Sequence, residues 1–176
     1  LLTISEKTNQ LDLLVNCAGM TRFVPHQDLE SLDDELIDQI FQVNWRGSFS
    51  TIRSFRQLLE NSPEALIINI SSIAGKTGEG SNVAYCASKA ALDSMTRSLA
   101  RALAPKIRVV SVAPGVVDTE FIKGLDPEWR EKQLRRTPSG HFAQPEEVGK
   151  AILHLFQDLK SLNGCRLDLD GGRPLG

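Results

Sequence analysis

A tyrosine and a lysine stand four positions apart in the stretch SNVAYCASKAAL, residues 81–92. The alanine-rich run is typical of a helix, where side chains four positions apart share a face, so we expect Tyr85 and Lys89 to be neighbours. A free phenol has a pKa near about 10, and an ammonium about 4 Å away would lower it by nearly three units before solvent screening. The pair therefore predicts a tyrosine that gives or takes a proton near neutral pH.

Ser72 stands thirteen positions before Tyr85, at the end of the apolar run ALIINIS. A hydroxyl there is placed to hydrogen-bond a substrate oxygen beside the phenol and to stabilise developing charge. The plain alternative is a surface pair on a helix, with Ser72 opening a turn, because a tyrosine and a lysine at this spacing are common by chance. The surrounding elements have to decide between the two interpretations.

Short, apolar runs predict the strands. Near-continuous Leu, Ile and Val is typical of strands buried on both faces of a parallel sheet, and a fourth run that alternates more suits an edge or last strand. The four predicted strands cover residues 11–17, 65–71, 107–113 and 165–170.

Three helices are predicted between these strands. The first begins at Ser31 as N-cap and continues, with a bend at Gly47, toward Leu59. The second covers 82–104 and ends before Pro105, and the third begins at Pro145. Alternating strands and helices predict an α/β fold, a doubly wound parallel sheet in a single domain.

Composition excludes several classes of protein. Hydrophobic residues make up 41% of the chain and charged residues 24%, with a net charge of −2. This gives no basic field for nucleic acid or a membrane surface, and no apolar run approaches the ~18 residues of a membrane span. No basic-then-apolar signal segment opens the sequence. We therefore expect a cytoplasmic protein.

Cysteine and histidine give no sign of a disulfide framework or a metal site. Three widely spaced cysteines among apolar residues are read as reduced thiols. The three histidines do not show metal-ligand spacing, and we expect Asp168 and Asp170 to face solvent.

Five ordered motifs carry a family resemblance. They are NCAG (16–19), VN (43–44), NISS (69–72), YCASK (85–89) and PGVVDT (114–119). In this order and spacing the chain resembles the classical short-chain dehydrogenase/reductase family along nearly all of its length, including the terminal LDLDGG. The resemblance implies a Rossmann-like fold that binds NAD or NADP, a choice that the sequence leaves open.

The resemblance implies catalytic roles for four residues. Tyr85 matches the acid/base that exchanges a proton with the substrate oxygen, and Ser72 matches the hydroxyl that orients the substrate. Lys89 matches the residue that lowers the tyrosine pKa and binds the nicotinamide ribose, and Asn44 matches an asparagine that holds a water of the proton relay.

It also implies cofactor contacts at the strand ends. Asn16, Ala18 and Gly19 would line the adenosine side, together with Tyr85 and Lys89 at the ribose. The nicotinamide would be held by Pro114, Gly115, Val117 and Thr119. Small residues at these strand ends allow backbone to approach a flat cofactor closely.

Two departures from the family pattern stand out. Cys17 occupies the place of a second asparagine, and we expect it to be a small buried apolar residue. No glycine-rich pyrophosphate turn precedes the first predicted strand. At ~30 residues or more per βαβ unit, about 70 residues of the family's domain have no counterpart here. Residues 1–176 are thus expected to be the C-terminal part of one NAD(P)-binding domain, whose preceding segment pairs with strand 11–17.

Other segments suggest a lid and an assembly. The polar stretch 118–140 takes the place of a substrate lid, with an ordinary solvated helix pair as the alternative. The candidate pocket residues are Met20, Ile73, Val117, Phe121 and Trp129. Small residues on helix 82–104 favour close packing, and the resemblance implies a homodimer or homotetramer.

The sequence predicts an NAD(P)-dependent oxidoreductase that interconverts a secondary alcohol and a ketone, with a 3-oxoacyl thioester as one candidate substrate. Two alternatives stay open. One is a catalytically idle relative that acts as a cofactor sensor or interaction subunit, and the other is an epimerase or dehydratase on the same fold.

Overall fold

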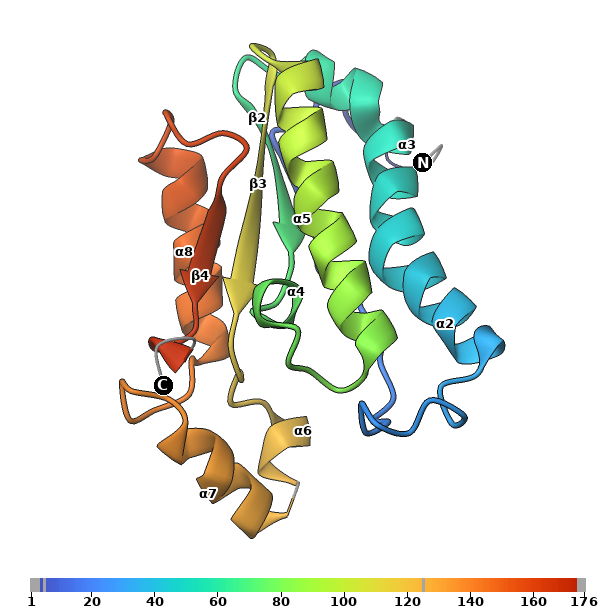
Figure 1. The fold of residues 1–176 in the computed structure, drawn as a ribbon. Coiled ribbons are helices and arrows are strands. Elements are labelled where there is room, and N and C mark those ends of the chain that lie inside the picture. Colours follow the sequence, from blue (N-terminus) through green and yellow to red (C-terminus); the bar gives the residue numbers. More distant parts are fainter. Residues whose placement is uncertain (1–3, 5, 125, 174–176) are drawn as a thin grey trace.

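The computed structural model describes residues 4, 6–124 and 126–173 and shows one four-stranded parallel sheet (Figure 1). Its order is β1-β2-β3-β4, with every neighbouring pair parallel. The bounds are Leu13–Asn16 for β1, Ala65–Ile70 for β2, Ile107–Pro114 for β3 and Arg166–Leu169 for β4. All four predicted strands and the α/β fold class are therefore confirmed.

Helices cover both faces of the sheet. In Figure 1, α3 and α5 lie over one face and α8 over the other. The helical bounds are Asp34–Phe41 (α2), Gln42–Gly47 (η1), Ser48–Glu60 (α3), Ala74–Thr77 (α4), Val83–Leu103 (α5), Glu120–Lys123 (α6), Pro127–Arg135 (α7) and Pro145–Gln157 (α8).

Alternate residues of the central strands build the two cores. On β2, Ile67 packs with Leu59 of α3 and Leu92 of α5, while Ile68 faces the other way and packs with Leu155 of α8. All five side chains are buried almost completely. Each such side chain contributes about 1.5–3 kcal/mol when it leaves water. Burial on both faces explains why these strands read as continuous apolar runs.

The helix whose N-cap was predicted at Ser31 has its N-cap two residues later. Asp33 is the N-cap, and its carboxylate accepts a hydrogen bond from the Leu36 backbone N–H at 2.8 Å. The Ser31 prediction is wrong because the Ser31 N–H is held in a preceding turn by the Asp28 carboxylate. The bend predicted at Gly47 takes the form of a π-helical turn, η1, between α2 and α3. The wider turn carries Asn44, so the irregularity lies at a predicted site residue.

The predicted starts of the two later helices are confirmed. Asn82 caps α5, and Pro145 is the first residue of α8. The stretch 118–140 forms two short helices, α6 and α7. In the described part of the chain, no helix is both long enough and apolar enough to cross a membrane. The same residues contain no cluster of three or more His, Cys, Asp or Glu side chains suited to a metal ion.

Candidate active site

Tyr85 is held in the first turn of α5 by the helix cap. The Asn82 backbone is extended, and its side-chain oxygen accepts a hydrogen bond from the Tyr85 N–H at 2.7 Å. The amide nitrogen of Asn82 donates to the Arg22 carbonyl at 2.7 Å, so the cap also anchors the loop that follows β1. Asn82 is fully buried. The start of α5 is thereby fixed relative to the sheet, and Tyr85 with it.

Ser72 follows β2 and reaches the phenol of Tyr85. Its hydroxyl hydrogen-bonds the Tyr85 side chain and accepts the Ala74 N–H at 3.2 Å. The turn around it is tied to β3, because the Ser71 N–H donates to the Val112 carbonyl at 2.7 Å and the Ile73 N–H donates to the Pro114 carbonyl at 3.0 Å. Two parallel strands therefore position the serine hydroxyl next to the phenol.

A cavity of about 290 Å³ lies at the carboxyl ends of β1, β2 and β3. Seven of the predicted site residues line it: Gly19, Ser72, Tyr85, Lys89, Pro114, Gly115 and Val117. Five further residues complete the lining: Cys17, Met20, Thr21, Ile70 and Ser71. The carboxyl ends of parallel strands are where open α/β sheets bind ligands.

Three predicted cofactor residues do not line this cavity. The side chain of Asn16 is buried, donates to the Asn69 side chain at 2.9 Å and accepts from the Thr51 hydroxyl. Ala18 is exposed, and Thr119 accepts a hydrogen bond from the Ile122 N–H as the N-cap of α6. In this structure Asn16 links β1 to β2 and α3, and Thr119 caps α6.

Asn44 lies behind the cavity wall. It is fully buried, and its side-chain oxygen accepts the Met20 N–H at 2.8 Å. Its amide nitrogen donates to the Met20 carbonyl at 3.1 Å and to the Ser88 hydroxyl at 3.0 Å. A Cβ at Gly19 would lie 3.5 Å from Asn44 Oδ1 and 3.6 Å from Lys89 Nζ. Asn44 and Lys89 thus flank the same glycine, and Asn44 Oδ1 keeps the capacity to accept a second hydrogen bond.

The electrostatics correct one expectation from the sequence. Burial raises the pKa of Tyr85 above its ordinary value of 10.0, the Ser72 hydrogen bond lowers it, and the neighbouring Cys86 raises it. The predicted lowering by Lys89 is wrong because the Lys89 ammonium lies 5.7 Å from the ring centroid and donates to the Ile70 carbonyl at 2.8 Å. Tyr85 therefore holds its proton at neutral pH.

The pKa of Lys89 is lowered, whereas that of Tyr85 is raised. Burial lowers the pKa of its ammonium from 10.5 to about 8, against raising effects of Cys17 and Asp93. Only 5% of the residue is exposed. Near physiological pH this amine therefore sits close to its midpoint, where a small change in its surroundings alters its charge.

The Lys89 pKa predicts a pH-dependent contribution to stability. Between pH 8 and 10.5 the unfolded chain binds more protons at Lys89 than the folded chain, so folding stability rises with pH. The full difference is on the order of 3 kcal/mol, at about 1.4 kcal/mol per pKa unit. We expect the free energy of unfolding of the wild type, minus that of Lys89→Met, to rise from pH 8 toward pH 10. Denaturant titrations at stepwise pH measure it, and parallel curves for the two proteins would contradict the assignment.

Some cavity residues carried only a weak signal in the sequence. Cys17 was expected to be buried but is exposed and lines the cavity, because it lies just beyond the end of β1. Thr21 and Ser71 were not identified as site residues from the sequence. The only sequence feature that could have indicated them is their position, five residues after β1 and one residue after β2. All three cysteines are free, as expected.

The candidate pocket residues divide between different places. Met20 and Val117 line the cavity, and Ile73 is buried next to it at the start of α4. Trp129 lies in a shallow hollow of about 490 Å³ formed by residues 126–135, which contains none of Ser72, Tyr85 or Lys89. The side chain of Phe121 lies outside the described residues.

Comparison with known proteins agrees with the fold. A family model described as enoyl-(acyl carrier protein) reductase matches residues 2–173. The 3-oxoacyl-(acyl-carrier-protein) reductase FabG of Thermotoga maritima is 36% identical over 171 residues, covering 96% of this chain and 68% of the relative. Cyclopentanol dehydrogenase of Comamonas sp. is 38% identical over 174 residues, 97% of this chain and 68% of that protein.

A solved structure shows the same architecture. A putative short-chain dehydrogenase/reductase from Burkholderia xenovorans superposes with a TM-score of 0.91 at 32% identity, covering 99% of this chain and 69% of that one. The fold and these relatives therefore define an α/β oxidoreductase. More specifically, the chain belongs to the family of NAD(P)-dependent short-chain dehydrogenases/reductases, and it spans about two thirds of the length of these relatives.

Proposed function

We propose that this protein interconverts a secondary alcohol and a ketone with NAD or NADP, and that Tyr85 is the catalytic acid/base. One observation carries the proposal: the Ser72 hydroxyl, the Tyr85 phenol and Lys89 all line one cavity at the carboxyl ends of the strands. The hydrogen bond between Ser72 and Tyr85 brings two oxygen atoms together that can hold one carbonyl oxygen between them.

The cavity residues fit the nicotinamide end of the cofactor. Pro114, Gly115 and Val117 line the cavity at and after the end of β3, and Lys89 lines it from α5. A Cβ at Gly115 would lie 3.1 Å from Asp170 Cα, so the backbone at Gly115 packs closely against the backbone at Asp170. When bound, a nicotinamide supplies or accepts the hydride. Lys89 would hold the ribose, as in the family pattern, with its Nζ beside Gly19.

The chain's own residues handle the oxygen and the proton. In the direction of reduction, the raised pKa of Tyr85 keeps the phenol protonated, so it donates its proton as the carbonyl oxygen gains charge. The Ser72 hydroxyl donates a hydrogen bond to the same oxygen and stabilises that charge. In the direction of oxidation the tyrosinate accepts the alcohol proton, and the Ser72 hydroxyl, whose hydrogen bond lowers the Tyr85 pKa, stabilises it.

The names of the relatives suggest where to look for the substrate. FabG of Thermotoga maritima is a 3-oxoacyl-(acyl-carrier-protein) reductase and the Comamonas protein a cyclopentanol dehydrogenase. We propose a ketone with an apolar part, a 3-oxoacyl thioester being the first candidate, because Met20 and Val117 give the cavity apolar walls.

Oxidation of NADH or NADPH in the presence of a carbonyl panel tests the proposal. The panel should include 3-oxoacyl thioesters and cyclic ketones, and each cofactor should be tried separately, since the preference between NAD and NADP is open. We expect turnover with at least one ketone and the reverse reaction with its alcohol. Cofactor binding without turnover across the panel would instead favour a sensor or interaction subunit.

Assembly and lid motion belong to the same proposal. We propose a homodimer or homotetramer with α5 near the interface, and a lid formed by residues 118–140 that closes over the substrate. Arg130 of α7 pairs with Asp118 at 2.8 Å, and this contact connects the start of the lid segment to its second helix. Residues 1–176 would be the C-terminal part of the cofactor-binding domain.

A further inference from the structure

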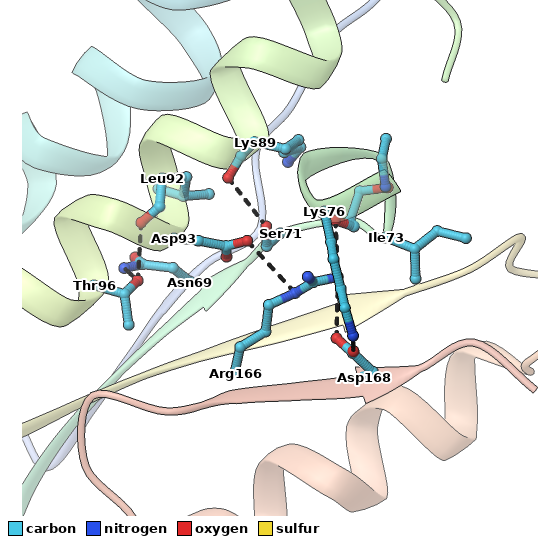
Figure 2. A network of polar contacts seen from close by, with 12 residues as sticks. Asn69, Ser71, Ile73, Lys76, Lys89, Leu92, Asp93, Thr96, Arg166 and Asp168 are labelled. Carbon is cyan, nitrogen blue, oxygen red and sulfur yellow. Dashed lines mark hydrogen bonds and ion pairs between the residues drawn. The ribbon is translucent and has the colours of Figure 1, made fainter. Parts of the chain in front are cut away.

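A partly buried arginine joins the last strand to the catalytic helix. Figure 2 shows Arg166 of β4 between Asp93 of α5 and Asp168 of its own strand. Its Nε lies 3.4 Å from Asp93 Oδ2, and a terminal nitrogen lies 3.0 Å from Asp168 Oδ1. The side chains of Arg166 and Asp93 are 15% and 7% exposed. Asp168 was expected to face solvent, and that expectation is wrong because it pairs with Arg166 and with Lys76, at 3.2 Å.

The same guanidinium reaches the backbone of the catalytic serine. A terminal nitrogen of Arg166 donates to the Ser72 carbonyl at 3.3 Å. Asp93 stands one helical turn after Lys89 on α5. Arg166 therefore contacts both the residue that carries the hydroxyl and the helix that carries the phenol and the ammonium.

We propose that Arg166 is a positioning residue that sets the distance between the Ser72 hydroxyl and the Tyr85 phenol. The planar guanidinium presents several donors in a fixed fork, so it can bind the Asp93 carboxylate and the Ser72 carbonyl at the same time. Asp93 is the anchor on α5, and the Ser72 carbonyl is the group that is held. The proposal rests on the function proposed above.

Lysine cannot replace this geometry. An ammonium on a flexible stem keeps the charge next to Asp93 but cannot also hold the Ser72 carbonyl from the same position. Asp93 Oδ1 has no hydrogen-bond partner within residues 4–173 as described. Removing the cation would thus leave a buried carboxylate without its counter-charge, which is why Arg166→Lys is the informative variant.

The phenol itself reports the position of Ser72. The Ser72 hydrogen bond lowers the Tyr85 pKa, so a hydroxyl that drifts away lets the pKa rise. The sequence contains a single tyrosine, so the absorbance change of tyrosinate formation belongs to Tyr85 alone. The titratable groups facing the phenol are Lys89 and Cys86 on α5 and Cys17 after β1, and they are the same in every variant below.

A double-mutant cycle on that absorbance tests the inference. We expect Arg166→Lys to raise the Tyr85 midpoint, Ser72→Ala to raise it further, and the double variant to match Ser72→Ala alone. We also expect kcat of Arg166→Lys to fall by about ten- to a hundredfold with little change in KM, because a small misplacement costs this much. Lys76→Met, which removes only the outer contact to Asp168, is the matched control and should change neither quantity.

The outcomes separate positioning from a purely structural role. If Arg166→Lys lowers the melting temperature but leaves the Tyr85 midpoint unchanged, Arg166 is structural and the inference is wrong. A shift that persists in the Ser72→Ala background would show that Arg166 affects the phenol by a route other than Ser72, which also overturns the inference. Should Arg166→Lys not fold, Asp93→Asn removes the anchor and is expected to give the same Ser72-dependent shift.

Failure of the proposed function would be seen separately. A wild-type protein that reduces no carbonyl compound would contradict the function. The tyrosinate titration needs no substrate, so the coupling between Arg166, Ser72 and Tyr85 would still be measured and still decide the inference.

Discussion

Replacing Tyr85 with phenylalanine is expected to lower kcat by about 10²–10⁴-fold, the range that a positioned proton donor contributes. The substitution removes the phenolic oxygen and keeps the ring. The contact between the ring and the Lys89 ammonium, 5.7 Å from the centroid, is therefore retained. Because Lys89 and the cavity wall stay in place, we expect cofactor affinity to change by only a few fold.

The measurement is steady-state reduction of the best ketone, together with a fluorescence titration of the reduced cofactor. Since the phenol is also the only tyrosine, loss of the tyrosinate absorbance confirms the substitution in the folded protein. A kcat within a fewfold of the wild type would show that the proton comes from another group or from water. Weakened cofactor binding at unchanged kcat would make Tyr85 a binding residue.

The sequence was informative about this site because its signals are local. Residues 65–71 alternate between two buried faces, so their apolar run predicted β2, and with it the position of Ser72 at a strand end. The spacing of Tyr85 and Lys89 predicted that they share a face of α5. Both inferences use only backbone periodicity, and periodicity is shared by the sequence and the fold.

Long-range contacts explain what could not be predicted. Whether the Tyr85 pKa is raised or lowered depends on burial and on where the Lys89 ammonium lies. The ammonium is held by the Ile70 carbonyl, nineteen residues away. Arg166 reads in the sequence as an ordinary charged residue of an alternating strand. Its contact with Ser72 spans 94 positions, so no pattern along the chain could indicate it.

Replacing Gly75 with alanine is expected to damage stability and catalysis together. Gly75 lies in α4, and a Cβ there would come within 2.8 Å of both the Ala90 nitrogen and the Lys89 carbonyl carbon on α5. Backbone atoms cannot turn aside as a flexible side chain can, so α4 has to move away from α5. Forcing an extra carbon into such a contact costs about 1–3 kcal/mol.

The displacement reaches the proposed catalytic groups directly. Gly75 follows Ser72 by three residues, and its N–H donates to the Ser72 carbonyl at 3.0 Å. A shift of α4 therefore moves the serine hydroxyl relative to Lys89 and Tyr85, and a misplacement of about 1 Å can cost about 10²-fold in rate. We expect a loss of kcat of this order and a melting temperature lower by about 2–4 °C for each kcal/mol.

Gly149→Ala is the matched control, because the same methyl group is added to a helix where nothing lies within 4 Å of the new carbon. On the exposed face of α8 the alanine is expected to stabilise the protein by about 0.5–1 kcal/mol and to leave kcat unchanged. Thermal melts and initial rates on the three proteins measure both effects. Gly75→Ala with wild-type melting and wild-type kcat would mean that α4 and α5 do not meet backbone to backbone at Lys89, and that the serine hydroxyl is held by something other than this contact.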